Sequence, residues 1–250
     1  MKLSHLLSAT LYCAAMGLLS PSDANAQVIL SDSFDRVEGF ADDPQNMNNF
    51  SSWGDNDNAL GGTEVQTYTM DTSRGGGAQN TTDGSVAILR NGASQINTDL
   101  GPLAPIGYTV AFDFQRTTGN GFLALGIGLD PTLIPGTGGF NGNAFLFDTN
   151  VDSDGAVLFQ QDNANPGAGR VQLFNAGDVV TQVENAFPNN EDVHAALITV
   201  VAPNGYGNGA TGTLKTSVDG GPEFISAITF DGSNSGYLAL YSNQTGATVD

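Results

Sequence analysis

Acidic and amide side chains gather in residues 143–162, whose sequence is NAFLFDTNVDSDGAVLFQQD. Asn150, Asp152 and Asp154 alternate there and a glycine follows, a spacing that matches positions 1, 3, 5 and 6 of a calcium-binding loop. The match is partial, because Asn stands at the first position and Gln161 stands at the twelfth, where a bidentate Glu is expected. Two interpretations stay open: a calcium site, or a solvated turn between two strands.

Aromatic and polar side chains elsewhere suit sugar binding, because sugar rings present apolar C–H faces and polar edges. Tyr237 and Tyr241 alternate with leucines in one run, and Trp53, the only tryptophan, lies in a long polar segment. Asp113 lies on the polar face of another alternating run and is the best isolated acid. These four residues are the expected carbohydrate-binding set, and packing in the core or at its rim is the alternative for each aromatic ring.

Catalytic groups are scarce. Glycoside hydrolysis needs two carboxylates that face one bond. The chain has five glutamates: Glu38, Glu64, Glu184, Glu191 and Glu223. None of them has an acidic partner two or four residues away on a convincing strand. His194 is the one histidine after the leader described below, so a multi-histidine metal site is excluded. We expect a structural role for His194 at a strand edge, and a protein that is not an enzyme.

The elements that position these residues are short apolar or alternating runs that end at Gly, Asn, Asp or Pro. Residues 108–116 (YTVAFDFQR) and 122–129 (FLALGIGL) are two such runs. No stretch keeps the 3.6-residue apolar period of a helix. The expected fold class is all-β, with about a dozen strands in a two-sheet antiparallel β-sandwich.

Turn residues between these runs predict which strands pair. Asn91-Gly92 predicts a hairpin of residues 85–90 and 94–100. The acidic run within residues 143–162 predicts a second hairpin, of residues 144–147 and 156–159. We expect both strands of this second hairpin to be central in their sheet and covered on both faces. Further pairs are expected for 170–175 with 179–183, 213–218 with 224–230, and 236–241 with 247–250.

The N-terminus has the three-part pattern of a secretory signal peptide. Lys2 supplies the positive region, residues 6–19 form a mostly apolar segment, and Ala24-Asn25-Ala26 is a small-x-small cleavage site before Gln27. The apolar segment is too short to span a bilayer. We therefore expect residues 1–26 to be a leader and 27–250 to be one secreted domain. Without its leader the chain has no cysteine, which suggests a bacterial exported protein without disulfides.

The net charge of the chain limits the classes of partner that it can bind. Acidic residues outnumber basic ones 26 to 7, which gives a formal net charge of −19. Such a field repels nucleic acid and anionic lipid. Neutral polysaccharides, divalent cations and basic partners remain open.

Three segments resemble the concanavalin A-like lectin/glucanase superfamily, in particular its laminin-G-like jelly rolls of secreted bacterial type. Residues 192–200 (DVHAALITV) and 212–220 (GTLKTSVDG) resemble a characteristic strand pair, residues 31–35 (SDSFD) resemble an opening strand, and residues 236–241 and 247–250 resemble closing strands. The resemblance implies a jelly roll whose closing strand usually runs a few residues further, so we expect a C-terminal piece to be missing. It also implies calcium between the first and last strands, at Asp32 and Asp250. The E-x-D-x-x-E motif of its glucanases is absent.

These observations predict a secreted, non-catalytic, lectin-like module that binds a polysaccharide or glycoconjugate with the help of calcium. Two alternatives from other classes stay open. One is a structural or adhesive module of the cell surface or matrix, and the other is a divergent glycan-active hydrolase. A catalytic carboxylate pair would favour the hydrolase, and a flat surface without exposed aromatic rings would favour the structural module.

Overall fold

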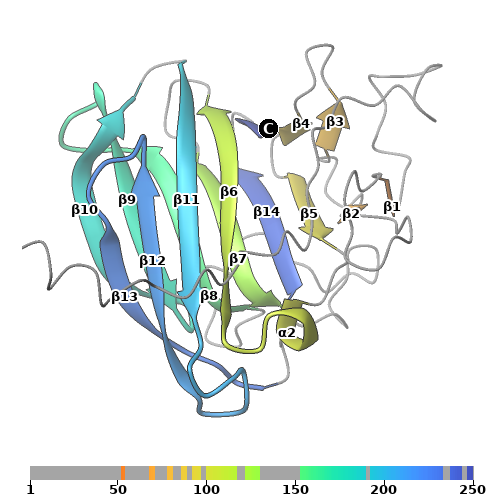
Figure 1. The fold of residues 1–250 in the computed structure, drawn as a ribbon. Coiled ribbons are helices and arrows are strands. Elements are labelled where there is room, and N and C mark those ends of the chain that lie inside the picture. Colours follow the sequence, from red (N-terminus) through yellow and green to blue (C-terminus); the bar gives the residue numbers. More distant parts are fainter. Residues whose placement is uncertain are drawn as a thin grey trace, which may run out of the picture.

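The computed structural model describes residues 52–53, 68–70, 78–80, 86–88, 92–96, 100–116, 122–129, 153–189, 192–232, 237–243 and 247–249. These residues are almost all in strands, with one short helix, α2 (Leu100–Leu103), at the start of the long strand β6 (Figure 1). In this part of the chain no helix is long and apolar enough to cross a membrane. The all-β fold class is confirmed.

The larger sheet has eight antiparallel strands in the order β1-β2-β5-β14-β7-β8-β9-β10. Their bounds are β1 Ser52–Trp53, β2 Tyr68–Met70, β5 Gly92–Ile96, β14 Tyr237–Asn243, β7 Phe122–Leu129, β8 Ser153–Gln161, β9 Ala168–Asn175 and β10 Asp178–Pro188. We call it the eight-stranded sheet.

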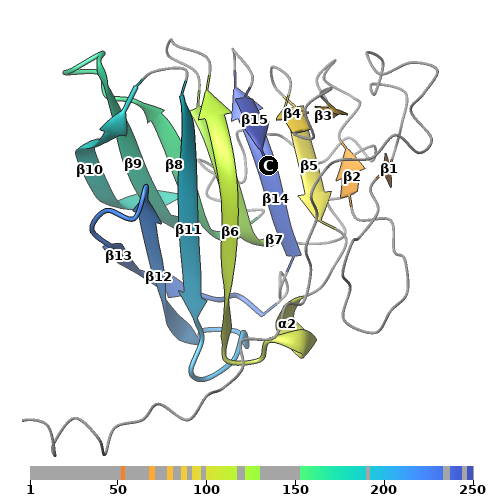
Figure 2. The same cartoon turned by 45° about the horizontal axis from the view of Figure 1, so that its top comes forward.

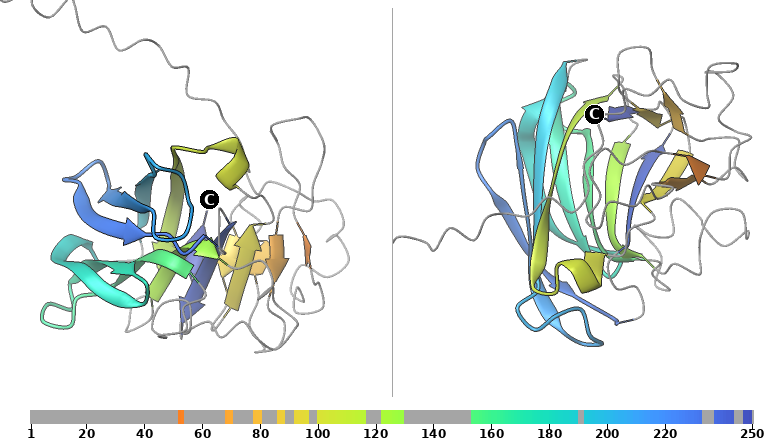
Figure 3. Two further views of the ribbon diagram at one scale, coloured as in Figure 1. Left: turned by 90° about the horizontal axis from the view of Figure 1, so that it is seen from below. Right: turned by 45° about the vertical axis from the view of Figure 1, so that its right-hand side comes forward.

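The second sheet has seven antiparallel strands in the order β13-β12-β11-β6-β15-β4-β3. Their bounds are β13 Phe224–Thr229, β12 Thr211–Val218, β11 Val193–Val201, β6 Gly107–Arg116, β15 Ala247–Val249, β4 Val86–Ile88 and β3 Ala78–Asn80. The two sheets lie face to face as two layers, seen from four directions in Figures 1, 2 and 3.

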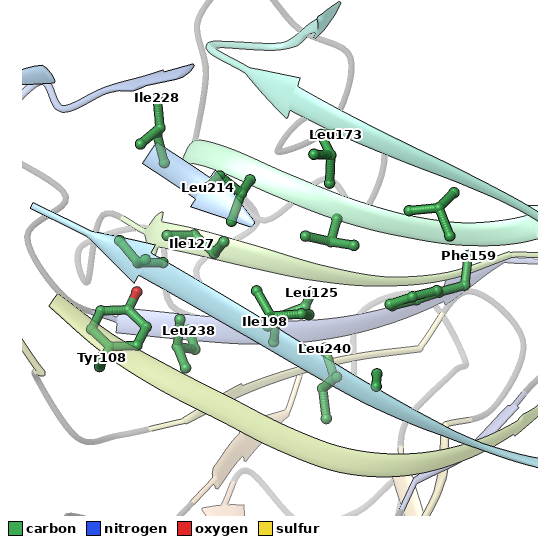
Figure 4. Packing of buried hydrophobic residues seen from close by; sticks show 14 of the residues in the cluster. Tyr108, Leu125, Ile127, Phe159, Leu173, Ile198, Leu214, Ile228, Leu238 and Leu240 are labelled. Atoms are coloured by element: carbon green, nitrogen blue, oxygen red, sulfur yellow. The ribbon is translucent and has the colours of Figure 1, made fainter. Parts of the chain in front are cut away.

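The core lies between the sheets, because each strand turns one alternating set of apolar side chains inward. Figure 4 shows side chains of the two layers pointing toward one another, with Leu125, Phe159 and Leu238 from the eight-stranded sheet and Ile198 and Leu214 from the other. All five are buried. The predicted alternation is confirmed for residues 108–115: Tyr108, Val110, Phe112 and Phe114 face the core, and the odd positions face outward.

Two hairpins predicted from turn residues are confirmed, because β9 pairs with β10 and β12 pairs with β13. The strand pair expected from the superfamily resemblance is confirmed by the pairing of β11 with β12. Ala176 and Gly177 connect β9 to β10 with φ of 47° and 83°. Positive φ at both central residues is the signature of a type I′ turn, whose twist suits a two-residue hairpin. The local turn chemistry thus fixed these pairs correctly.

Two predicted pairs are wrong because their strands enter different sheets. β4 and β5 flank the Asn91-Gly92 sequence, but β4 pairs with β3 and β15 while β5 pairs with β2 and β14. In the same way β14 lies between β5 and β7, whereas β15 lies between β6 and β4. The strands on the two sides of each short connection thus belong to different layers of the sandwich, so turn residues alone do not show the partner.

The hairpin predicted around the acidic run is also wrong in part. β8 begins at Ser153, so Asp154 and Gly155 are strand residues and not a solvated turn. β8 pairs with β7 and β9, and residues 144–147 lie outside the described part of the chain. The prediction of a central strand covered on both faces is confirmed for β8, since Ala156 to Phe159 are all at most 1% exposed.

Candidate functional site

Three glutamines form a continuous row across the outer face of the eight-stranded sheet, and we call them the amide row: Gln160 on β8, Gln172 on β9 and Gln182 on β10. They face away from the core because their strand neighbours Phe159, Val171 and Leu173 face into it. Gln160 Nε2 donates to Gln172 Oε1 at 2.6 Å, and Gln172 Nε2 donates to Gln182 Oε1 at 2.6 Å. The row therefore joins three neighbouring strands through side-chain hydrogen bonds.

Charged groups close both ends of the amide row. Gln182 Nε2 donates to Glu184 Oε1, and Arg170, in register with Gln160, lies with its Nη1 3.8 Å from Glu184 Oε1. The amide atom of Gln160 that faces Gln172 also lies 2.8 Å from Arg170 Nε. That position suits a nitrogen that donates to Gln172 or an oxygen that accepts from Arg170, so the Gln160 amide has two hydrogen-bonding orientations.

Asp162, which directly follows β8, completes this cluster. Its Oδ1 accepts from the backbone N–H of Ala164 at 2.7 Å and of Asn165 at 3.3 Å. Burial raises its pKa, but these two backbone N–H groups, the neighbouring Glu184 side chain and the charge of Arg170 together hold the pKa of Asp162 below its usual value. Asp162 is therefore an ionised structural partner of the β8–β9 turn at neutral pH.

The amide row becomes exposed toward the edge of the sheet. Gln172 is buried, Gln182 and Glu184 are exposed, and Glu184 keeps 37% of its side chain in solvent. Toward the middle of the sheet, the residues in register with Gln172 on the next strands are Leu158 on β8, Ala124 on β7 and Tyr241 on β14. Leu158 and Ala124 are buried on this face as well. The accessible part of the described face thus lies on β9 and β10, where the exposed end of the amide row and the exposed Val179 are found.

Such an arrangement offers planar hydrogen-bonding groups to a polyhydroxylated ligand. Amides donate and accept, a carboxylate accepts and a guanidinium donates in a fixed fork. Because Gln160, Gln172 and Arg170 hold one another, the exposed Gln182 and Glu184 are fixed from behind. Fixed polar side chains lose little conformational entropy when they bind a ligand.

A second feature of interest is the carboxylate of Asp154 at the start of β8, which is 3% exposed. Its Oδ1 accepts from the backbone N–H of Asp231 at 2.9 Å, and no donor among the described residues reaches its Oδ2. Gly128 on β7 makes room for this oxygen, since a Cβ there would lie 2.2 Å from Oδ2. Burial, opposed by the Asp231 N–H and reinforced by the Asp231 charge, raises the pKa of Asp154 from 3.8 to about 7.

The orphaned Oδ2 of Asp154 fits a cation, because a buried carboxylate oxygen without a donor is stabilised by a positive ion. The described residues contain no group of three or more His, Cys, Asp or Glu that could hold a metal. Asn150, Asp152, Asp32 and Asp250, the other expected calcium ligands, lie outside the residues that the structure describes. Calcium therefore stays a prediction.

The structure separates the four residues expected to bind sugar. Trp53 on β1, Tyr237 and Tyr241 on β14 all belong to the eight-stranded sheet, and β2 and β5 lie between their strands. Asp113 belongs to β6 in the other sheet, where it is exposed and in register with Ala195. Asp113 therefore does not share a site with the three aromatic residues.

His194 lies in the interior and not at a strand edge, which corrects the expectation above. It is 4% exposed on β11, between β6 and β12. Its Nδ1 lies 2.8 Å from Asp219 Oδ2, and its ring packs against Phe114 and Phe187. A structural role agrees with this packing.

Sequence reasoning missed the amide row, although its residues alternate along their strands as Arg170-x-Gln172 and Gln182-x-Glu184. The missing information was register. From the Ala176-Gly177 turn, Asp178 pairs with Asn175 and Val179 with Phe174, but a bulge at Val180 then shifts the pairing by one residue. Without that bulge Gln182 would point into the core.

Comparison with known proteins gives structural matches only. No protein-family model matches the chain, and no curated protein matches it either. Similar solved structures include the winged bean acidic lectin with methyl-α-D-galactose (11% identity, 80% of this chain and 92% of that one, TM-score 0.47). The Emp46p carbohydrate recognition domain (13%, 75% and 89%, 0.43) and the Bacillus licheniformis β-glucanase (10%, 69% and 78%, 0.40) are two others.

The resemblance to concanavalin A-like jelly rolls, with its laminin-G detail, remains a prediction. Because lectins and a glucanase occur together at identities this low, the matches assign no activity to the chain. The fold assignment rests on the two sheets described above.

Proposed function

We propose that the chain is a secreted, non-catalytic carbohydrate-binding module whose binding surface is the exposed end of the amide row. The observation that carries the proposal is the hydrogen-bonded series Gln160, Gln172, Gln182 and Glu184, with Arg170 behind it. A row of polar side chains fixed on rigid strands positions hydrogen bonds better than a loop does.

The ligand class that suits this surface is a neutral glycan. The guanidinium of Arg170 already faces Glu184 and Asp162, so it is not available as a clamp for a uronate or sulfate group. The net charge of −19 adds long-range repulsion of polyanions. A neutral, hydroxyl-rich glycan needs no cationic clamp and is not repelled by the net negative charge.

A glycan array with the full secreted chain tests this proposal. We expect binding to neutral glycans and a loss of about tenfold or more in affinity for Glu184→Gln, because a charge-assisted hydrogen bond contributes ~1.5–3 kcal/mol. Glu223→Gln is the matched control, since Glu223 is an exposed carboxylate on the β12–β13 connection of the other sheet. Equal affinity of both variants, or no binding by the parent chain, would overturn the proposal.

Calcium is proposed as a stabilising ion, with Asp154 as its one described ligand. Calcium that binds only the folded chain raises the melting temperature by mass action. We expect added calcium to raise the melting midpoint and EDTA to lower it, in the parent chain but not in Asp154→Asn. An unchanged midpoint would remove calcium from the proposal.

An adhesive or structural module is the second candidate, and one observation favours it. The large apolar side chains that are exposed in the described part of the chain are all aliphatic, as in Val193, Leu197 and Ile225. Lectin surfaces that stack on sugar rings use aromatic side chains. A module that recognises another protein surface needs only a flat aliphatic face.

A further inference from the structure

The outer face of the seven-stranded sheet carries a line of exposed aliphatic side chains along its strand β11. Val193, Leu197 and Val201 are 61%, 45% and 36% exposed, at positions that place them on the same face of the strand. Ile225 on β13 is 52% exposed on the same outer face. Exposed apolar surface of this kind on a regular sheet marks a contact site more often than a random surface does.

This face is almost free of charge, in a protein whose net charge is −19. Between the aliphatic residues the outward positions are small or hydroxylated, apart from Gln115 beside Val193: Ala111, Ala195, Ala227, Thr109, Thr199, Thr213 and Ser217. The two charged side chains among the described outward positions of β6, β11, β12 and β13 are Asp113 and Lys215. Lys215 is 34% exposed, and its Nζ lies 3.5 Å from Oε2 of Glu223, the residue before β13. The face therefore carries little of the repulsion that keeps two copies of such an acidic chain apart.

The two charges lie on opposite sides of Leu197. β11 runs between β6 and β12 (Figures 1 and 2). Asp113 is in register with Ala195, two residues before Leu197, and Lys215 is in register with Thr199, two residues after it. Leu197 is thus the midpoint of a diagonal from Asp113 to Lys215.

A two-fold axis in the plane of the face exchanges these charges. If the axis passes through Leu197 at right angles to the diagonal, Asp113 of one copy lies over Lys215 of the other, and the reverse. Two copies then bury Leu197 against itself with one pair of opposite charges on each side. Self-complementarity about a two-fold axis is what an isologous dimer requires, and the sheets would cross at a steep angle, as in orthogonal sheet packing.

We propose that this face is the dimerisation surface of the chain, with a second copy as its occupant. Four strands of about eight residues cover roughly 500 Å² per copy, at ~4.8 Å between strands and ~3.3 Å per residue. Stable interfaces bury about 800 Å² per partner. Because the estimated area is smaller than that of a stable interface, we expect the dimer to be reversible.

Sedimentation velocity of the full secreted chain across ~1–200 μM tests the surface. The parent chain shifts from monomer to dimer, and Leu197→Asp stays monomeric over the whole range. Val179→Asp is the matched control, because Val179 is 46% exposed on β10 of the other sheet, and it dimerises like the parent chain. A parent chain that stays monomeric, or a dimer that Val179→Asp disrupts and Leu197→Asp does not, would overturn the proposal.

A charge exchange tests the symmetry. The exchange is made in a Glu223→Gln background, which removes the partner of Lys215 within the chain. There Asp113→Lys and Lys215→Asp each place like charges opposite one another in both halves of the interface, so each weakens dimerisation by about tenfold. The double variant restores opposite charges at both positions and recovers the parent affinity. Circular dichroism confirms the fold of each variant. Single variants without effect, or a double variant weaker than both, would exclude the two-fold arrangement through Leu197.

Discussion

At the scale of single residues, some side chains and backbone conformations of the folded chain lower its stability when each is considered by itself. Asp154 is a buried carboxyl with one oxygen unsatisfied among the described residues, and Ala176 has a left-handed backbone without being glycine. Both features are locally unfavourable, and they persist because the packing of the surrounding strands stabilises the fold that contains them. Each leads to a prediction.

Asp154 makes stability depend on pH. Its pKa is about 7 in the folded chain, against 3.8 when exposed, so the folded state binds the proton more tightly. Stability is therefore highest below pH ~4 as far as this group is concerned, falls as the pH rises toward ~7, and is level above it, with a loss of at most about 4 kcal/mol.

Asp154→Asn removes this dependence. In calcium-free buffer we expect the variant to melt above the parent chain at pH 8 and to lose that advantage by pH 4. Thermal melts across that range measure it, with Asp178→Asn as the control, because Asp178 is exposed at the start of β10. Parallel melting curves for Asp154→Asn and the parent chain would contradict the prediction.

Ala176 is the first residue of the β9–β10 turn and has φ of 47°. A left-handed conformation costs ~1–2 kcal/mol in residues other than glycine and is easier for asparagine. Ala176→Asn creates the Asn-Gly sequence preferred in this turn, and we expect a gain of about 1 kcal/mol, seen as a rise of ~2–4 °C in melting temperature. Ala164→Asn, at an exposed turn residue without positive φ, should leave the midpoint unchanged.

At the scale of elements, register decided what the sequence could and could not reveal. Strands β6, β7, β11, β12 and β13 were predicted closely, because their alternation or apolar runs are long and their turns carry Gly and Asp. The pairs β4–β5 and β14–β15 were wrong, because the strands of each pair belong to different layers. The amide row was invisible because the bulge at Val180 sets which residues of β10 face outward.

The junction of β9 with β10 gives an element-scale prediction. Gly169 is in register with Phe187, and a Cβ on Gly169 would lie 2.3 Å from the Phe187 ring. Phe187 is 5% exposed in the core, so it has no free space to move into. Gly169→Ala should cost ~1–3 kcal/mol as overpacking.

Urea unfolding measures that cost. Gly167→Ala is the matched control two residues away, where the nearest atom to a Cβ is Asn165 Oδ1 at 3.7 Å, an ordinary contact. Combining Gly169→Ala with Phe187→Leu should recover part of the loss, because the smaller side chain gives way. Equal stability of the two glycine variants would show that the β9–β10 junction adapts freely.

At the scale of the whole molecule, the two outer faces have different characters. The eight-stranded sheet presents a polar row near its β10 edge, and the seven-stranded sheet presents a nearly uncharged aliphatic face. A dimer through the second face would leave the first free in both copies, pointing away from the interface. Two weak sugar sites on one particle bind a repeating glycan more tightly than one, through effective concentration.

The positions of β14 and β15 also affect how the chain folds. β14 joins β5 to β7 in one sheet, and β15 joins β4 to β6 in the other, so the N-terminal strands β1 to β5 attach to their sheets only through strands from the far end of the described chain. Neither sheet becomes continuous until residues more than a hundred positions apart have met. Contacts of such high sequence separation slow folding, because loop-closure entropy is lost before they form. We therefore expect β6 to β13 to form early, largely from neighbours in sequence, and the flank that carries Trp53 to dock last.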